Sequence, residues 1–402
     1  MAGMFDRASR RGNVEPFWAM EILKLSNELK SQGREVFPLC LGQPSTPAPT
    51  PVLEAAKCAL TNEQLGYTDA LGLASLRQRI ADNYRNDYAA TVSPEQIAIT
   101  TGSSAAFTAI FLAAFEAGDA VAMTRPGYPA YRNTLSSLGC QVVELDCGPD
   151  SGWRPSIENL EKLTNYRPIA GLIIASPSNP TGTVLTEPEL ADIYSWCSEN
   201  DVLLISDEIY HQIGFGTDFA SVTQFGDEHI AVGSFSKYFS MTGWRLGWTV
   251  LPKPLVRPVE LLLGNLNLSA PTLSQFAAMA AFDPQSRLEL NSHVQRYRRN
   301  RDIVAAGIAE IGCPTPPPAD GAFYCFPDVS QLCEDSRFWC ADLLRETGVA
   351  LTPGVDFATN SLPGDGLDPA LDGKHFVRIS YSGSTEIVTE GIRRLVNFVT
   401  NG

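Results

Sequence analysis

Apolar runs alternate with amphipathic stretches through the middle of the chain. Helix-like stretches such as Ala105–Glu116, Ile157–Thr164 and Glu187–Asn200 separate most of the apolar runs. Strand followed by helix in repetition predicts an α/β fold, in which helices cover a mostly parallel sheet. The predicted strands are Gln96–Thr100, Ala120–Met123, Gln141–Leu145, Ile169–Ala175, Val202–Ser206, Ile230–Ser234 and Leu246–Leu251.

The alternation ends in the last third of the chain. A long polar helix is predicted over Pro284–Ile311, and the Pro-rich stretch Cys313–Gly321 that follows has the composition of a connector. The remainder predicts a smaller α+β unit, interrupted by a loop rich in Gly, Pro and Asp at Asn360–Gly373. The expected domains are a large one over residues 48–283 and a small one made of residues 1–47 and 284–402.

Charge and composition exclude several classes of partner. The chain of 402 residues carries a formal net charge of −15, which disfavours nucleic acid and anionic membrane surfaces. No apolar run reaches membrane-spanning length, and the N-terminus lacks the apolar core of a signal peptide. The 9 cysteines form no CxxC pair and lie apart from the 4 histidines. We therefore expect a cytoplasmic protein with free thiols and no metal site.

Polar residues follow the predicted strands, where parallel sheets bind their ligands. Ser103 and Ser104 come after the first strand and open a helix, so their backbone N–H groups and hydroxyls could hold an anion. Serine is also a routine helix N-cap, so this turn alone decides nothing. Asn179 follows Ile169–Ala175 in a Ser-Asn-Pro-Thr-Gly turn, which presents one amide side chain or is an ordinary turn.

Two charged residues follow the next predicted strands. Asp207 stands at the mouth of an apolar strand, where a carboxylate has to be paired, ligand-bound or solvated. Lys237, one of seven lysines, lies in a row of Ser, Phe, Tyr, Met and Trp with no other charge before Arg245. Aromatic surroundings desolvate a lysine, which lowers its pKa and makes its amine nucleophilic. This is the environment that a Schiff-base lysine needs.

Taken in order, these motifs resemble the fold-type I, pyridoxal 5′-phosphate (PLP) dependent aminotransferases of classes I and II. The motifs are Asn179-Pro180-Thr181-Gly182, Ser206-Asp207-Glu208-Ile209-Tyr210, Ser234-Phe235-Ser236-Lys237 and Gly243-Trp244-Arg245. The match extends from Leu41-Gly42-Gln43-Pro44 to Arg378, which is nearly the whole chain. Each motif is weak alone, but their joint order and spacing are highly specific. The resemblance implies a large domain, whose mostly parallel sheet is sandwiched by helices, plus a smaller α+β domain.

The same resemblance implies the catalytic roles. Lys237 would hold PLP as a Schiff base and, once displaced by the substrate amine, carry the proton between Cα and the cofactor. Asp207 would pair with the pyridine nitrogen, and Tyr210 and Asn179 would donate hydrogen bonds to the phenolic oxygen. The implied reaction is ping-pong, in which an L-amino acid leaves as its 2-oxo acid and a second oxo acid takes up the amino group.

Further residues correspond to binding positions of the family. Arg378 would hold the substrate α-carboxylate, beside Gly42 and Asn179, and Tyr128 would stack on the cofactor ring. Tyr67 matches a tyrosine that reaches the phosphate bound by the neighbouring subunit, so a homodimer with shared active sites is implied. The expected phosphate-binding residues are Ser103, Ser104, Ser234, Ser236 and Arg245.

The sequence departs from aspartate-specific members of the family in one respect. Some of them hold the distal carboxylate with a lysine at the position of Ser104, and others with an arginine from the partner's segment corresponding to Leu261–Ser274. Here Ser104 is neutral, and no Arg or Lys lies between Arg257 and Arg287. We therefore predict a neutral or aromatic amino donor rather than aspartate. Candidates for an apolar side-chain pocket, or simply for the core, are Phe17, Trp18, Ala19, Met20, Tyr131 and Phe323.

Three alternative functions compete with that of an aminotransferase. A PLP-dependent β-lyase acting on cysteine conjugates would use the same lysine, so the sequence separates it poorly from an aminotransferase. A non-catalytic PLP-binding regulator would usually append a DNA-binding domain, for which the stretch before Leu41 is too short and the charge too acidic. A dinucleotide-dependent dehydrogenase is discarded, because no GxGxxG follows a predicted strand.

Overall fold

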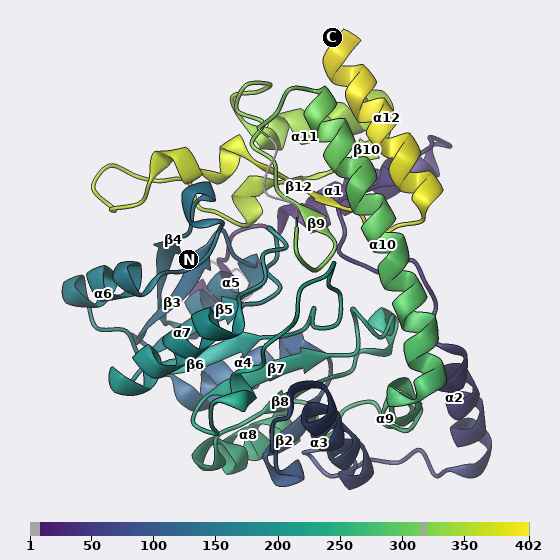
Figure 1. Ribbon diagram of the computed structural model, residues 1–402, viewed down its shortest axis with the longest axis vertical. Coiled ribbons are helices and arrows are strands. Elements are labelled where there is room, and N and C mark those ends of the chain that lie inside the picture. The colour runs from purple at the N-terminus through teal and green to yellow at the C-terminus, as the bar shows by residue number, and fades with distance from the viewer. Residues whose placement is uncertain (1–8, 315–318, 402) are drawn as a thin grey trace, which may run out of the picture.

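A seven-stranded sheet with helices on both faces forms the centre of the molecule (Figure 1). The computed structural model describes residues 9–314 and 319–401. The sheet has the order β2-β8-β7-β6-β5-β3-β4, and only β8 runs antiparallel to its neighbours. The strands are β2 (Ile97–Thr100), β3 (Ala120–Arg125), β4 (Gln141–Asp146), β5 (Gly171–Ala175), β6 (Leu203–Asp207), β7 (Ile230–Ser234) and β8 (Gly247–Val250).

Alternating side chains along the strands divide the core between the two faces of the sheet. On β5, Leu172 and Ile174 pack into one buried cluster, whereas Ile173 packs into another. The first cluster includes apolar residues of α3 (Ala74–Tyr88), α6 (Ile157–Tyr166) and α7 (Glu187–Glu199). The second includes residues of α4 (Ser103–Ala114), α5 (Pro129–Leu138) and α8 (Lys253–Leu266). Both faces are covered, which is the condition for a mostly parallel sheet.

The predicted fold class is confirmed, and each predicted strand is present with its ends shifted by at most two residues. One predicted helix begins earlier than expected: α4 starts at Ser103 rather than Ala105, directly after Gly102, whose φ of +73° turns the chain. The long polar helix is α10 (Pro284–Glu310). Of the predicted connector Cys313–Gly321, residues 315–318 lie outside the described residues.

Smaller sheets bring the N-terminal arm together with the C-terminal part of the chain (Figure 1). One sheet pairs β1 (Phe37–Pro38) with β10 (Val349–Ala350), and the other has the order β11-β12-β9. The division into domains at residues 48–283 stays a prediction. The remaining elements are α1 (Trp18–Ser31), α2 (Thr50–Asn62), α9 (Thr272–Ala278), β9 (Tyr324–Cys325), α11 (Ser336–Thr347), β11 (Thr352–Pro353), β12 (Val377–Ser380) and α12 (Thr385–Asn401).

None of the helices within residues 9–314 and 319–401 combines the length and the apolar composition needed to cross a membrane. The same residues contain no group of three or more His, Cys, Asp or Glu side chains arranged to hold a metal ion.

Candidate active site

A cavity of about 600 Å³ opens where the carboxyl ends of β6 and β7 face the C-terminal part of the chain. Segments from the N-terminal arm, the central sheet and the C-terminal part all contribute to its lining. Most of the site residues predicted from the sequence therefore lie around one cavity. Those that line the cavity are Gly42, Ser103, Ser104, Tyr128, Asn179, Asp207, Tyr210, Ser236, Lys237, Arg245 and Arg378.

Two of the predicted residues do not line this cavity. Ser234 is buried at the end of β7, and its Oγ accepts a hydrogen bond of 3.0 Å from the backbone N–H of Ser236. Tyr67 lies on the surface with 83% of its area exposed. Within one chain, therefore, Ser234 is hydrogen-bonded to a cavity residue, Ser236, and Tyr67 is exposed away from the cavity lining.

Lys237 lies on the cavity wall with its amine hydrogen-bonded to backbone. Nζ donates to the carbonyl oxygen of Gly42 at 2.8 Å, and it lies 5.6 Å from the centre of the Tyr210 ring. Burial, together with the charge of Arg378, lowers the pKa of Lys237 to about 8. About a tenth of the amine is therefore uncharged at pH 7, far more than for an ordinary lysine, and the uncharged amine is the nucleophile.

Asp207 is the last residue of β6 and is almost completely buried. Its Oδ1 accepts a hydrogen bond of 3.1 Å from the backbone N–H of Ile209, and its Oδ2 accepts one from the phenol of Tyr131. Burial raises the pKa of Asp207 to about 6, against the effect of these hydrogen bonds and of the Lys237 charge. Asp207 is thus predominantly a carboxylate at neutral pH, held at the floor of the cavity.

Arg378, on β12, is held between two aromatic rings. Its Cζ lies 4.5 Å from the centre of the Tyr324 ring and 4.6 Å from that of Phe357. Nη1 donates to Asn179 Oδ1 at 2.9 Å and Nη2 to the carbonyl of Cys40 at 2.6 Å. Among the described residues, its buried Nε has no acceptor. A guanidinium fixed in plane with a donor left over suits a carboxylate ligand.

The start of α4 is built to bind an anion. Its N-cap, Gly102, provides no capping side chain, so the first backbone N–H groups of the helix remain available beside Ser103 and Ser104. Arg245 closes this site: a Cβ at Gly102 would lie 2.5 Å from its Nη2. Gly102 therefore brings a helix N-terminus and a guanidinium together, a combination that fits a phosphate group.

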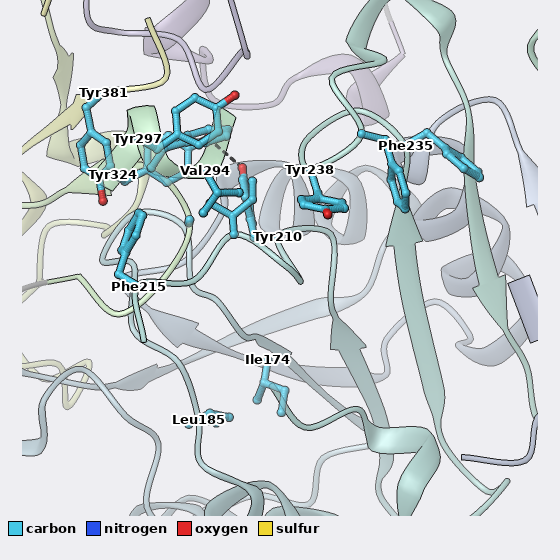
Figure 2. Packing of buried hydrophobic residues seen from close by; sticks show 14 of the residues in the cluster. Ile174, Leu185, Tyr210, Phe215, Phe235, Tyr238, Val294, Tyr297, Tyr324 and Tyr381 are labelled. Atoms are coloured by element: carbon cyan, nitrogen blue, oxygen red, sulfur yellow. Dashed lines mark hydrogen bonds between the residues drawn. The ribbon is translucent and has the colours of Figure 1, made fainter. Parts of the chain in front are cut away.

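Tyr324, on β9, lines the cavity and was missed by the sequence analysis. Its phenol lies 2.7 Å from the phenol of Tyr210, and Figure 2 shows the two rings among the buried aromatics. Only 1% of its surface is exposed. Tyr324 stands in an apolar run, Ala322-Phe323-Tyr324, whose pattern is that of a buried strand. Nothing in the local sequence therefore marks it as part of a polar site.

The apolar side of the cavity differs in part from the expected one. Phe17, Ala19 and Met20 line it as predicted, and Leu23 of α1 joins them. Phe323 does not, because it is buried in the core against the Tyr210 and Tyr297 rings. The lining also omits Trp18. Tyr131 lines the cavity, but it serves as a hydrogen-bond donor to Asp207 and not as an apolar wall.

Comparisons with known proteins agree with this arrangement. The family model described as aminotransferase class I and II matches residues 34–395. A valine–pyruvate aminotransferase of Mycobacterium tuberculosis is 44% identical over 98% of each chain. A (5-formylfuran-3-yl)methyl phosphate transaminase of Methanocaldococcus jannaschii is 34% identical over 96% of this chain and 98% of its own. The crystal structure of an aminotransferase from Mycobacterium tuberculosis superposes with a TM-score of 0.93 at 43% identity, covering 99% of this chain and 100% of the other. This chain therefore belongs to the class I and II aminotransferases.

Proposed function

We propose that this aminotransferase binds PLP through Lys237 and moves the amino group of a neutral L-amino acid to a 2-oxo acid. The observation that carries the proposal is the joint lining of one cavity by Lys237, Asp207, Arg245 and Arg378. The Lys237 amine suits an aldehyde, and the charges of Asp207, Arg245 and Arg378 suit, in turn, a pyridine nitrogen, a phosphate and a carboxylate. The donor set thus fits PLP and an amino acid together.

When bound, PLP supplies the sink for the electron pair left at the substrate Cα. Asp207 would hold a proton on the pyridine nitrogen, because a buried carboxylate favours a cation beside it. Asn179 accepts from Arg378 through Oδ1, which leaves its Nδ2 to donate toward the phenolic oxygen, together with Tyr210. Lys237, with its lowered pKa, would take the proton from the substrate Cα and pass it to the cofactor.

The charge of the cavity supports a neutral donor. Within residues 9–314 and 319–401, the basic residues of its lining are Lys237, Arg245 and Arg378, and each has a role toward the cofactor or the α-carboxylate. A second substrate carboxylate would be buried against Phe17, Met20 and Leu23 without a cation, which is costly. The valine–pyruvate specificity in the name of a relative 44% identical to this chain is consistent with such a pocket.

We also propose a cytoplasmic homodimer. Tyr67 is exposed within a surface that holds further exposed apolar residues, Leu65, Leu266 and Leu268. The two segments are adjacent, because Thr272 Oγ1 donates to the carbonyl of Gly66 at 2.6 Å. Exposed apolar side chains on adjoining segments are typical of an interface between protein chains. The 9 cysteines are all unpaired, which supports a reducing compartment.

The visible absorption spectrum tests the proposed reaction directly. Purified protein loaded with PLP is mixed with single amino acids in the absence of any oxo acid. We expect valine, alanine or phenylalanine to bleach the visible band at least about tenfold faster than aspartate. The Lys237→Ala variant, which should retain PLP but not turn over, is the control.

Three results would contradict the proposal. Absence of a visible band after PLP is supplied would exclude the cofactor. A faster reaction with aspartate would overturn the neutral-donor assignment. A persistent band with accumulating pyruvate and ammonia would identify a lyase instead of an aminotransferase.

A further inference from the structure

Tyr324 lies where three parts of the site meet. Its phenol is 2.7 Å from the phenol of Tyr210, and the face of its ring lies 4.5 Å from the Cζ of Arg378. A Cβ on Gly42 would lie 1.6 Å from the Tyr324 hydroxyl, so that hydroxyl occupies the space a side chain would fill. The carbonyl of the same Gly42 accepts the hydrogen bond from Lys237. One buried side chain therefore touches residues assigned to the cofactor, the substrate and the reactive amine.

The hydrogen bond between the two phenols has a direction that follows from counting protons. Each phenol has one O–H, and either oxygen can accept in the pair. Among the described residues, Tyr210 is the hydrogen-bond partner of the Tyr324 hydroxyl. If Tyr324 donates to Tyr210, the Tyr210 proton is free to point into the cavity. If Tyr210 donated to Tyr324, it would have no proton left for a ligand.

We propose that Tyr324 is a positioning residue that donates its proton to Tyr210 and thereby directs the Tyr210 proton to the phenolic oxygen of PLP. The inference rests on the proposed function, in which Tyr210 contacts that oxygen. Accepting a hydrogen bond polarises a phenol and strengthens the bond that it donates. Tyr324 thus makes Tyr210 a stronger donor while its ring supports the guanidinium of Arg378.

The consequence is measurable in the pH dependence of the cofactor spectrum. A strong donor to the phenolic oxygen draws negative charge from it, and that charge otherwise stabilises a proton on the lysine–cofactor linkage. Tyr324 therefore lowers the pH midpoint of the visible band. The Tyr324 side chain is held in place by the residues that bury it, because only 1% of its surface is exposed. The titratable and charged groups that face the two phenols are Tyr128, Asp207, Lys237 and Arg378.

The test removes one oxygen atom. Tyr324→Phe keeps the ring against Arg378 but loses the hydroxyl, so Tyr210 keeps its hydrogen bond to the cofactor in a weakened form. We therefore expect the visible-band midpoint of the PLP-loaded protein to rise by about 0.3 pH unit, a fraction of one hydrogen bond. The affinity for PLP, measured by fluorescence, should fall by about twofold. The affinity for a neutral amino acid carboxylate should be unchanged, because the face of the ring remains.

Tyr381→Phe provides a matched control. Tyr381 is also fully buried, its hydroxyl has no hydrogen-bond partner among the described residues, and it does not line the cavity. Both tyrosines are labelled in Figure 2. We expect the visible-band midpoint and the PLP affinity of Tyr381→Phe to match those of the unchanged protein. A wild-type midpoint in Tyr324→Phe, or an equal shift in both variants, would overturn the inference. A missing visible band in the unchanged protein would instead reject PLP binding itself.

Discussion

At the scale of a single residue, Asp207 is a carboxylate at neutral pH although its burial favours the protonated form. Its pKa lies near 6 because of burial, above the value of 3.8 for an unperturbed side chain. Since the folded value is the higher one, the stabilising effect of the protonated form is complete below pH 4 and is lost as pH rises through 6. A shift of two units corresponds to about 3 kcal/mol. Above pH 6, therefore, the carboxylate destabilises the cofactor-free protein.

We expect Asp207→Asn to be more thermostable than the unchanged protein without cofactor, and only above pH 4. Its advantage in melting temperature should grow between pH 4 and pH 6.5 and then stay constant, while its aminotransferase activity is lost. Thermal scans of the cofactor-free proteins over this pH range measure the difference. Asp227→Asn, at an exposed position, is the control and should not show this growing advantage. If the melting temperatures of Asp207→Asn and the unchanged protein differed by the same amount at every pH, burial of the Asp207 carboxylate would not have the assigned cost.

What the sequence revealed of the site depended on how far apart the partners of each residue lie. The sequence predicted a lowered pKa for Lys237 from its neighbours Phe235, Tyr238 and Phe239, but these side chains do not line the cavity. The pKa is lowered instead by burial and by the charge of Arg378, which is remote in the sequence. The partners of Tyr131 and Tyr324 are 76 and 114 residues away. Only the fold brings these phenols to Asp207 and Tyr210, so the local sequence suggested Tyr131 as apolar lining or core and did not mark Tyr324 at all.

At the scale of elements, apolar runs predicted where the strands lie but not their directions. Residues 246–251 were predicted to form a further strand of a mostly parallel sheet, but β8 runs antiparallel to β2 and β7. The direction follows from the connection: residues 235–246, which include Lys237 and Arg245, lead from β7 into β8 through one 3-10 turn and without a crossover α-helix. Lys237 and Arg245 of this connection both line the cavity.

Helix α1 is a second case in which the determining contact is remote. Phe17, at its N-cap position, makes no capping hydrogen bond through its side chain. Instead, Asp356 accepts hydrogen bonds from the backbone N–H groups of Trp18 and Ala19 at 2.7 and 2.8 Å. Because Met20 and Phe17 line the cavity, this carboxylate fixes the apolar wall from the other end of the chain.

We expect Asp356→Ala to weaken substrate binding through this wall. Loss of an N-cap costs about 1 kcal/mol, which corresponds to about a fivefold rise in KM for a neutral amino acid, with kcat less affected. Hydrogen exchange should increase in the first turn of α1. Asp335→Ala removes a comparable cap from α11, outside the cavity lining, and should leave KM unchanged. Equal KM effects in the two variants would show that α1 does not shape the pocket.

At the scale of the whole molecule, the proposed homodimer would give a role to one residue predicted from the sequence. Tyr67 does not line the cavity of its own chain, 83% of its surface is exposed, and Leu266 and Leu268 are exposed as well. If the proposed homodimer forms across this surface, each site consists of Lys237 from one chain and Tyr67 from the other. Loss of the Tyr67 hydroxyl then weakens PLP binding in the partner's site.

Mixed dimers distinguish this arrangement from a self-contained monomer. Lys237→Ala and Tyr67→Ala should each be inactive at low PLP concentration, the second because it lacks one hydrogen bond to phosphate. When the two variants are unfolded together and refolded, about half of the dimers are hybrids, and each hybrid has one site with both native residues. Activity should therefore recover to about a quarter of the unmixed native value. Because Tyr67 and Lys237 would have to come from the same chain in a monomer, mixing would then restore nothing. Recovery thus measures the sharing of residues between subunits and not dimerisation alone.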